Sequence, residues 1–136
     1  PAGNPSAVIN QHCADVALWC STSGYIDYIM PQLYYGFNNS SAPFTSMAQE
    51  WSNMVTCSAV RYYVALALYK ATDPSNSTSS DGNEWYNSND IIKRQIEYCN
   101  NSLPKCKGIA IFSYKDLLAG TSDVSSMVPA LKAFSN

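Results

Sequence analysis

Polar and aromatic side chains that could contact a sugar ring follow three short apolar segments of this sequence. Flat aromatic rings suit the C–H face of a pyranose, and amide or ammonium groups can bind sugar hydroxyls or carboxylates. The candidate binding residues are Gln32, Tyr34, Tyr35, Tyr69, Lys70, Trp85 and Tyr114. Core packing is the alternative for the aromatic residues, and it is the weakest alternative for Trp85, which lies in a polar segment. The alternatives are a satisfied rim position for Gln32 and a solvated strand end for Lys70.

Carboxylates that could act as acid and base are few near these segments. Glycoside hydrolysis ordinarily needs two carboxyl groups about 5 to 10 Å apart. The nearest acids are Asp27, Asp73, Asp81, Glu84 and Asp116, and no pair among them has a spacing that compels such a site. We expect Asp116 to compensate the dipole of a short helix, which is the common role of an acid in a first turn. The residues alone therefore assign no catalytic pair.

The cysteine and histidine content argues against metal and cofactor chemistry. The chain has five cysteines without a C-x-x-C pair and a single histidine, His12, which we interpret as structural. Phosphate-loop, dinucleotide-binding and G-x-S-x-G motifs are absent from the sequence, so no cofactor is expected. Cys13 and Cys20 lie on one predicted helix, too far apart to bridge. Cys99 and Cys106 flank a predicted turn and could form a disulfide; otherwise the cysteines are small buried hydrophobes.

Composition limits the partners of this chain. Its 136 residues correspond to one domain, and a formal net charge of −2 argues against nucleic acid or an anionic membrane surface. Charged residues make up 13%, about half the usual share, so Ser, Asn and Tyr supply the polar surface. Such a surface suits carbohydrate and an extracellular or cell-surface location. Apolar runs are too short for membrane insertion, and the lack of an initiator Met suggests a processed product or an excised fragment.

Three apolar segments are predicted to be β-strands, and amphipathic helices separate them. The predicted strands are 25–34, 62–69 and 108–113, and the last two are the nearly continuous apolar runs typical of parallel strands covered on both faces. Helical periodicity covers residues 9–20, 44–55, 92–99 and 124–131. The expected caps are Asn4, Ser41, and Asn87 or Ser88, while Pro129 would interrupt the last helix unless that helix starts late. The order α-β-α-β-α-β-α indicates parallel βα units.

Alternation within the strands assigns their faces. Val64, Leu66 and Leu68 should pack on helices, while Ala65, Ala67 and Tyr69 face a crowded interior. In the first strand, Tyr28, Met30, Gln32 and Tyr34 share a face, and Pro31 should mark a bulge or the end of regular pairing. The Ser/Asn/Asp-rich connection 71–87 follows a strand end and is expected to be a binding or mobile loop.

Three parallel strands do not make a closed structure. A (β/α)8 TIM barrel needs eight units and about 250 residues, whereas three strands leave two edges and one face uncovered. We therefore predict an α/β fold over 1–136, a single-domain, C-terminal half-barrel fragment with about three parallel strands and four or more helices. Its uncovered surfaces should drive homo-oligomerisation or association with an N-terminal half-barrel.

Four stretches of the sequence together resemble a known family. They are PAGNP at 1–5, GYIDYIMPQLYY at 24–35, YVALALYK at 63–70 and KGIAIFSY at 107–114. In this order they are similar to the C-terminal half of the glycosyl hydrolase-like family 10, from Pro1 to about Leu118. The resemblance implies a (β/α)8 barrel related to glycoside hydrolases, often secreted or on the bacterial cell surface. It also implies a substrate-lining role for Gln32, Tyr34, Tyr69 and Lys70.

The chain departs from the family pattern in two ways. The preceding half of related barrels, which supplies acidic catalytic residues near the fourth strand, is not in this sequence, and the family's paired Trp is here Glu50-Trp51. Two functions follow as hypotheses. One is part of a glycoside hydrolase-like barrel that acts on polysaccharide or peptidoglycan and is inactive in isolation. The other is a non-catalytic carbohydrate-binding or assembly module, favoured by the aromatic rim and the missing carboxylate pair.

Overall fold

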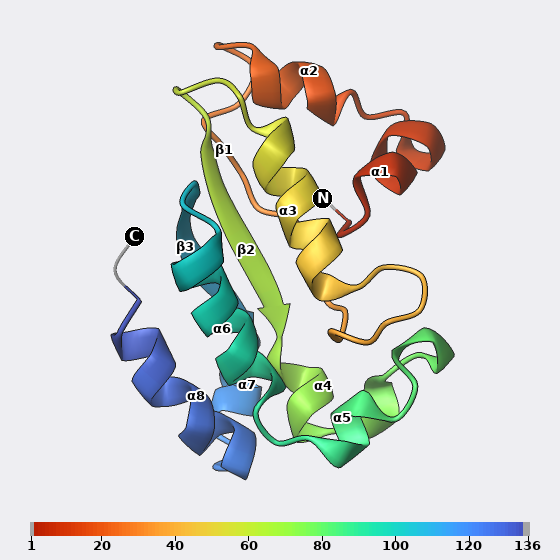
Figure 1. Ribbon diagram of the computed structural model, residues 1–136, viewed down its shortest axis with the longest axis vertical. Helices are drawn as coiled ribbons and strands as arrows, with labels where there is room; N and C mark the ends of the chain where they lie inside the picture. The colour runs from red at the N-terminus through yellow and green to blue at the C-terminus, as the bar shows by residue number, and fades with distance from the viewer. Residues whose placement is uncertain (1, 135–136) are drawn as a thin grey trace.

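The computed structural model describes residues 2–134 and contains a three-stranded parallel sheet with helices around it (Figure 1). The strands are β1 (Tyr28–Ile29), β2 (Arg61–Ala67) and β3 (Cys106–Phe112), with β2 in the middle. The described α-helices are α1 (Pro5–His12), α2 (Val16–Ser21), α3 (Phe44–Met54), α4 (Leu68–Thr72), α5 (Glu84–Asn87), α6 (Ile91–Ser102), α7 (Tyr114–Leu117) and α8 (Ser122–Lys132). This mixed α/β arrangement confirms the predicted class and is consistent with part of an α/β barrel.

One face of the sheet is buried under helices, as the alternation in β2 predicts. The side chains of Tyr62, Val64 and Leu66 are completely buried. The Tyr62 hydroxyl donates to the carbonyl oxygen of Ala48 in α3 at 3.0 Å. Burying each such side chain contributes about 1.5–3 kcal/mol. Since side chains alternate along a strand, the other residues of β2 point to the opposite face of the sheet.

The opposite face of the sheet carries small residues and aromatic rings. Ala65 and Ala67 lie on this face, with Tyr63 further back along β2. The ring of Tyr63 meets that of Tyr28 edge to face, with 5.8 Å between centroids. A Cβ on Gly108 would lie 3.0 Å from the Tyr63 ring, so this position of β3 favours glycine. Tyr28 leaves 58% of its surface exposed, because helices cover only the other face.

The first strand is much shorter than predicted, for the reason that the sequence indicates. Regular pairing ends after Ile29, and Pro31 has no N–H to donate, although its carbonyl oxygen accepts from the Ala65 N–H at 3.0 Å. Gln32 then makes an isolated parallel bridge with Ala65, and the N–H of Leu33 donates to the Ala65 carbonyl at 2.9 Å. The prediction that Pro31 ends regular pairing is confirmed.

The second strand ends earlier than predicted. Its last residue, Ala67, pairs with Phe112, which is also the last residue of β3. With no strand left to pair with, the chain turns into α4, so Leu68 and Tyr69 are helical and their assignment to a strand is wrong. The side chain of Leu68 is nonetheless buried, as expected.

The predicted first helix is two helices. α1 begins after Asn4, whose side chain accepts from the Ala7 N–H at 3.1 Å, as the predicted cap requires. It ends at His12, because Cys13 takes a left-handed conformation with φ of 51°. Cys13 and Cys20 therefore do not share a helix, contrary to the prediction. His12 is exposed on the last turn of α1.

The structure also differs from the sequence-based predictions in the connection 71–87 and at the starts of two helices. The connection 71–87 is not structureless: it contains the end of α4, the 3-10 helices η1 (Pro74–Asn76) and η2 (Ser79–Asp81), and α5. The predicted caps at Ser41 and at 87–88 are wrong, since α3 follows Pro43 and α6 follows Asp90. Helix α8 starts at Ser122 and continues through Pro129 to Lys132.

The five cysteines all lie in the described part of the chain, and none forms a disulfide. Cys99 and Cys106 are buried neighbours whose thiols share a hydrogen bond, so the alternative of a disulfide between them is not realised. Within residues 2–134, no helix combines the length and apolar character needed to span a bilayer.

Candidate functional site

A cleft of about 370 Å³ opens where the parallel strands end. Tyr34 follows β1, Tyr69 lies in the first turn of α4 just after β2, and Phe112 ends β3. In Figure 1 this is the end to which the arrow of β2 points, with α4, α5 and α7 beside it. The lining residues are Tyr34, Tyr69, Asp73, Asn76, Phe112, Ser113, Lys115 and Asp116. Ligands of α/β folds bind at this end of the strands.

Three aromatic rings form one wall of the cleft. The rings of Tyr34 and Phe112 stack with an interplanar angle of 26° and 6.1 Å between centroids. The Tyr69 ring meets both edge-on, 5.9 Å from Tyr34 and 6.1 Å from Phe112. Burial raises the pKa of Tyr34 and of Tyr69, so both hydroxyls stay protonated and able to donate. Phe112 is 56% exposed and offers a free aromatic surface for a sugar.

Two carboxylates lie in the cleft, and both are held ionised. Hydrogen bonds from Ser75 lower the pKa of Asp73. Burial works in the other direction for Asp116, but hydrogen bonds from the Ser113 hydroxyl at 2.5 Å and N–H at 3.1 Å outweigh it and lower its pKa. Asp116 thereby completes a capping box with Ser113 in the first turn of α7, where the sequence predicts a dipole-compensating acid. A glycosidase acid needs a raised pKa, and neither carboxylate that lines the cleft has one.

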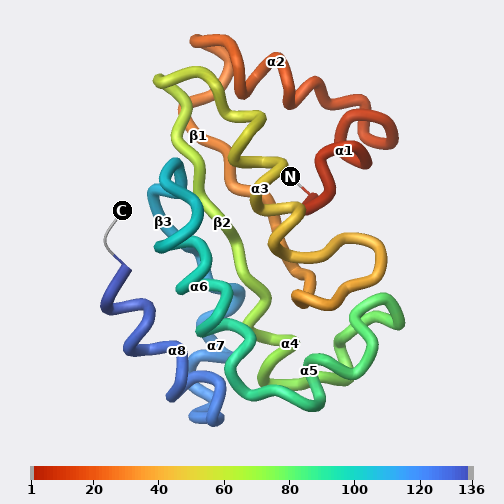
Figure 2. Tube along the Cα trace, viewed as in Figure 1, coloured from red at the N-terminus to blue at the C-terminus, as the bar shows by residue number. Residues whose placement is uncertain are grey.

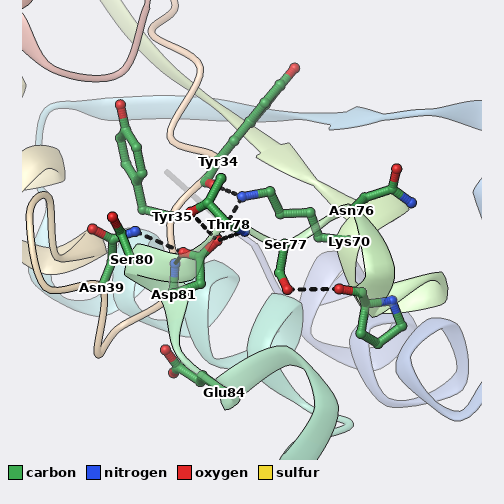
Figure 3. A network of polar contacts seen from close by, with 12 residues as sticks. Tyr34, Tyr35, Asn39, Lys70, Asn76, Ser77, Thr78, Ser80, Asp81 and Glu84 are labelled. Atoms are coloured by element: carbon green, nitrogen blue, oxygen red, sulfur yellow. Dashed lines mark hydrogen bonds and ion pairs between the residues drawn. The ribbon is translucent and has the colours of Figure 1, made fainter.

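Lys70 lies behind the cleft and is buried. Its Nζ donates to the carbonyl oxygen of Tyr34 at 2.8 Å and to Oδ2 of Asp81 at 2.9 Å (Figure 3). The ammonium also lies 5.8 Å from the centroid of the Trp85 ring. The lysine is only 4% exposed, so the alternative of a solvated strand end is wrong. The carboxylate that Lys70 binds is therefore that of Asp81, in the same chain, and not a carboxylate of a sugar.

Asp81 gathers four further hydrogen bonds around that ammonium. Its Oδ1 accepts from Asn39 Nδ2 at 2.8 Å and from the Gly36 N–H at 3.2 Å. Its Oδ2 accepts from the N–H and the hydroxyl of Thr78, both at 3.1 Å. Burial alone would raise the pKa of Asp81, but these bonds and the one from Lys70 hold it well below its usual range. Asp81 is therefore ionised, and both of its carboxylate oxygens are hydrogen-bonded.

The loops that carry this network lie side by side. The N–H of Ser40, in the loop after β1, donates to the carbonyl oxygen of Ser80 at 2.9 Å. The Asn38 N–H donates to Glu84 Oε2 at 2.8 Å. Figure 2 shows the two loops meeting, one before α3 and the other between α4 and α5. Together they form the rim next to the cleft.

The structure brings only some of the predicted binding residues together. Tyr34 and Tyr69 line the cleft, and Lys70 lies directly behind them. Trp85 is 1% exposed and belongs to the core, so the expectation that a polar segment leaves its ring free for a sugar is wrong. The indole lies between the Lys70 ammonium and the backbone at Gly36, within the core cluster.

The remaining predicted residues lie outside the cleft. Gln32 is exposed and is not among the residues that line it. The rings of Tyr34 and Tyr35 point apart, and Tyr35 lies against Gly3 instead (Figure 3). Tyr114 is 73% exposed on α7 but does not line the cleft. Whether any of these contacts a ligand stays a prediction.

Sequence reasoning missed the residue with the largest free aromatic surface in the cleft. The apolar pattern places Phe112 only at the end of a predicted strand, and Asn76 lies in a polar connection. Position along the strand was an available signal, because Phe112 shares its face of the sheet with Ala110 and Ala65. Among residues 2–134, no cluster of three or more His, Cys, Asp or Glu could hold a metal ion.

Comparisons with known proteins agree with this arrangement. The model of the family described as glycosyl hydrolase-like 10 matches residues 1–85. Glycosyl hydrolase DigH of Escherichia coli O6:H1 is 29% identical over 109 residues, which cover 79% of this chain and 24% of DigH. Glycosyl hydrolase YngK of Bacillus subtilis (strain 168) is 36% identical over 104 residues, which cover 76% of this chain and 19% of YngK. The chain thus spans about a quarter or less of the curated relatives that it matches. No solved structure matches it significantly.

Proposed function

Because the chain belongs to the glycosyl hydrolase-like 10 family, we propose that it forms part of a glycoside hydrolase barrel whose cleft binds a polysaccharide or a peptidoglycan strand. The aromatic wall of Tyr34, Tyr69 and Phe112 carries this proposal. Rings at the carboxyl ends of parallel strands lie where barrel enzymes bind substrate, and their faces suit the C–H surface of a sugar. The relatives' names, DigH and YngK glycosyl hydrolases, support the same class.

The charge state of the cleft supports binding rather than bond cleavage by this chain alone. The pKa values of Asp73 and Asp116 are lowered, so neither holds a proton at neutral pH for a glycosidic oxygen. We infer that the general acid comes from another part of the barrel and that residues 1–136 alone are inactive. The second candidate, a non-catalytic carbohydrate-binding or assembly module, is favoured by this same observation.

The uncovered parts of the sheet support a larger assembly. Ala2 pairs in parallel with Gln32, so the parallel order extends to the far side of β1. Beside β1, an apolar groove of about 490 Å³ contains Ile29 and Met30 and is bordered by Trp19. We propose that an N-terminal half-barrel, or a second copy of the chain, covers these surfaces. We further propose an extracellular or cell-surface location, where such glycans occur.

A binding experiment tests the cleft. The chain is titrated with oligosaccharides of N-acetylglucosamine and with soluble peptidoglycan strands, and affinity is compared with that of Phe112→Ala. Loss of the exposed ring should weaken binding about tenfold, which corresponds to about 1.4 kcal/mol. Tyr25→Ala is the matched control, since it removes an equally exposed ring, 56% in both cases, outside the cleft. Absence of binding by the wild-type chain, or equal losses in both variants, contradicts the proposal.

A second measurement separates the two candidate functions. Release of reducing ends from the same glycans is followed with this chain and with a full-length parent protein. Hydrolysis by the parent, with none by residues 1–136, is the result expected for a barrel enzyme. A parent that binds these glycans and cleaves none of them favours the non-catalytic module.

A further inference from the structure

The buried ammonium group of Lys70 connects two segments of the chain that line the cleft, one at Tyr34 and the other at 73–81. Lys70 follows Tyr69 directly, and its Nζ holds the carbonyl oxygen of Tyr34 at 2.8 Å. The two tyrosines whose rings meet in the cleft are thus joined through this one side chain. Lys70 does not itself line the cleft. Any effect that it has on a ligand must pass through the residues that it holds.

The same ammonium anchors the segment 73–81. Asp73 and Asn76, at its start, line the cleft, and the Asn76 amide donates to the Asp73 carbonyl oxygen at 3.1 Å. Asp81, at its end, pairs with Lys70 at 2.9 Å and accepts from the Thr78 N–H and hydroxyl. The segment is otherwise two short 3-10 turns on the surface. Backbone bonds hold Asp73 to Tyr69 at 3.0 Å and Ser80 to Ser40 at 2.9 Å, and the pair adds the side-chain tie between the end of the segment and Tyr34 (Figure 3).

Resting on the proposed function, we propose that Lys70 and Asp81 are positioning residues, whose buried ion pair fixes Tyr34, Tyr69 and the 73–76 wall and thereby sets the affinity of the cleft for glycans. Neither side chain touches the ligand. Their side chains are 5% and 0% exposed, so the pair is shielded from the screening that weakens surface ion pairs.

Substitutions at a buried ion pair can separate its effect on the geometry of the cleft from its effect on the stability of the chain. Replacing both partners of a buried ion pair by apolar residues of similar volume is often neutral or stabilising, whereas removing one leaves an uncompensated charge. Apolar replacements also lack the directed bonds to the Tyr34 carbonyl and to Thr78. A doubly apolar variant should therefore fold while its cleft loses its fixed geometry.

The test compares the wild-type chain with Lys70→Met/Asp81→Leu. Three readouts are recorded: the thermal midpoint, amide hydrogen exchange over residues 73–82, and the nuclear Overhauser contact between the rings of Tyr34 and Tyr69. Affinity for a hexamer of N-acetylglucosamine is the fourth. Lys93→Met is the matched control, because Lys93 and Glu97 form an exposed ion pair on α6 with 3.8 Å between charges.

We expect the double variant to unfold cooperatively but at a lower midpoint than the wild type, because the Asn39 amide and the Gly36 N–H lose their acceptor. Exchange over 73–82 should rise at least tenfold, the ring contact should disappear, and affinity should fall at least tenfold, while Lys93→Met changes none of these. Unchanged exchange and an intact ring contact, or unchanged affinity, would overturn the proposal. A wild-type chain that binds no glycan, but whose ring contact depends on the pair, counts against the proposed function and not against the positioning.

Asp81→Glu covers the case in which the double variant does not fold. It keeps both charges but displaces the carboxylate by one methylene. We expect faster exchange over 73–82 and weaker glycan binding in a chain that still unfolds cooperatively, because both charges are kept. Wild-type exchange and affinity in this variant would refute the positioning role.

Discussion

The indole Nε1 of Trp51 donates a hydrogen bond to the carbonyl oxygen of Gly3 at 2.7 Å. Trp51 is completely buried in α3, and Gly3 is buried in the N-terminal segment. A Cβ at Gly3 would collide with the Gln32 carbonyl and the Tyr35 ring, so the segment lies tightly between α3 and the chain that continues β1. This bond ties the first residues to α3, beside the end of the strand that leads to the cleft.

Trp51→Phe should therefore destabilise the chain. The substitution removes the donor and leaves a buried carbonyl without its partner, which costs about 1–3 kcal/mol. Urea unfolding followed by circular dichroism measures the change in the free energy of unfolding. Trp19→Phe, at a half-buried position beside the apolar groove, should cost less. Equal losses in the two variants would contradict the role of this bond.

Gly36→Ala should also be destabilising, for a steric reason. A Cβ at position 36 would overlap the carboxylate of Glu84, which is held by the Asn38 N–H at 2.8 Å. Overpacking of this kind costs about 1–3 kcal/mol. Thermal unfolding of Gly36→Ala and of Gly36→Ala/Glu84→Ala measures it. The second substitution should recover part of the loss, and a purely additive result would exclude the clash as the cause.

Stability should fall in alkaline solution because of Tyr62. Burial raises its pKa far above 10 in the folded state, while the unfolded chain ionises near the ordinary value of about 10. Its contribution is complete below about pH 10 and is lost as pH rises toward the folded pKa, by up to about 1.4 kcal/mol per pH unit. Urea unfolding between pH 8 and 11 should show a shallower slope for Tyr62→Phe. Tyr25→Phe, at an exposed ring, should keep the wild-type slope.

Asp123 should also make stability fall as pH rises, but at a lower pH than Tyr62. Burial is the main cause that raises the pKa of this carboxyl in the folded state. Its contribution is complete below the unfolded pKa of about 4 and is lost as pH rises through the folded pKa. Between pH 4 and 7 the wild type should therefore lose stability relative to Asp123→Asn. The difference in the free energy of unfolding should change by up to about 1.4 kcal/mol per pH unit between the unfolded and the folded pKa. A pH-independent difference would contradict this.

Thiol reactivity should follow burial. Cys13 is exposed and should react first with a chromogenic disulfide, followed by half-buried Cys57. Cys20, Cys99 and Cys106 are buried, and burial raises the pKa of Cys20 to about 11, so little thiolate forms there at neutral pH. Reaction in denaturant should give five thiols per chain. Fewer than five in denaturant would indicate a disulfide that the structure does not contain.

Much of the fold can be predicted from the sequence, because it depends on the local pattern of apolar and polar residues. Alternation placed Val64 and Leu66 against helices, and Pro31 marked the end of regular pairing in β1. Segment ends were less accurate, because they depend on neighbours: β2 stops at Ala67 only because its partner stops at Phe112. The break at Cys13 likewise has no periodic signal, since the apolar stripe continues across it.

Hydrophobic period and specific motifs are properties of neighbouring residues, so they predict the family, the parallel βα order and two of the three cleft aromatics, Tyr34 and Tyr69. That Trp85 belongs to the core and that Lys70 pairs with Asp81 follows only from the folded arrangement. Burial and charge pairing are set by whatever chain folds over a side chain. A polar loop gives no local sign that it will close over a tryptophan and a lysine.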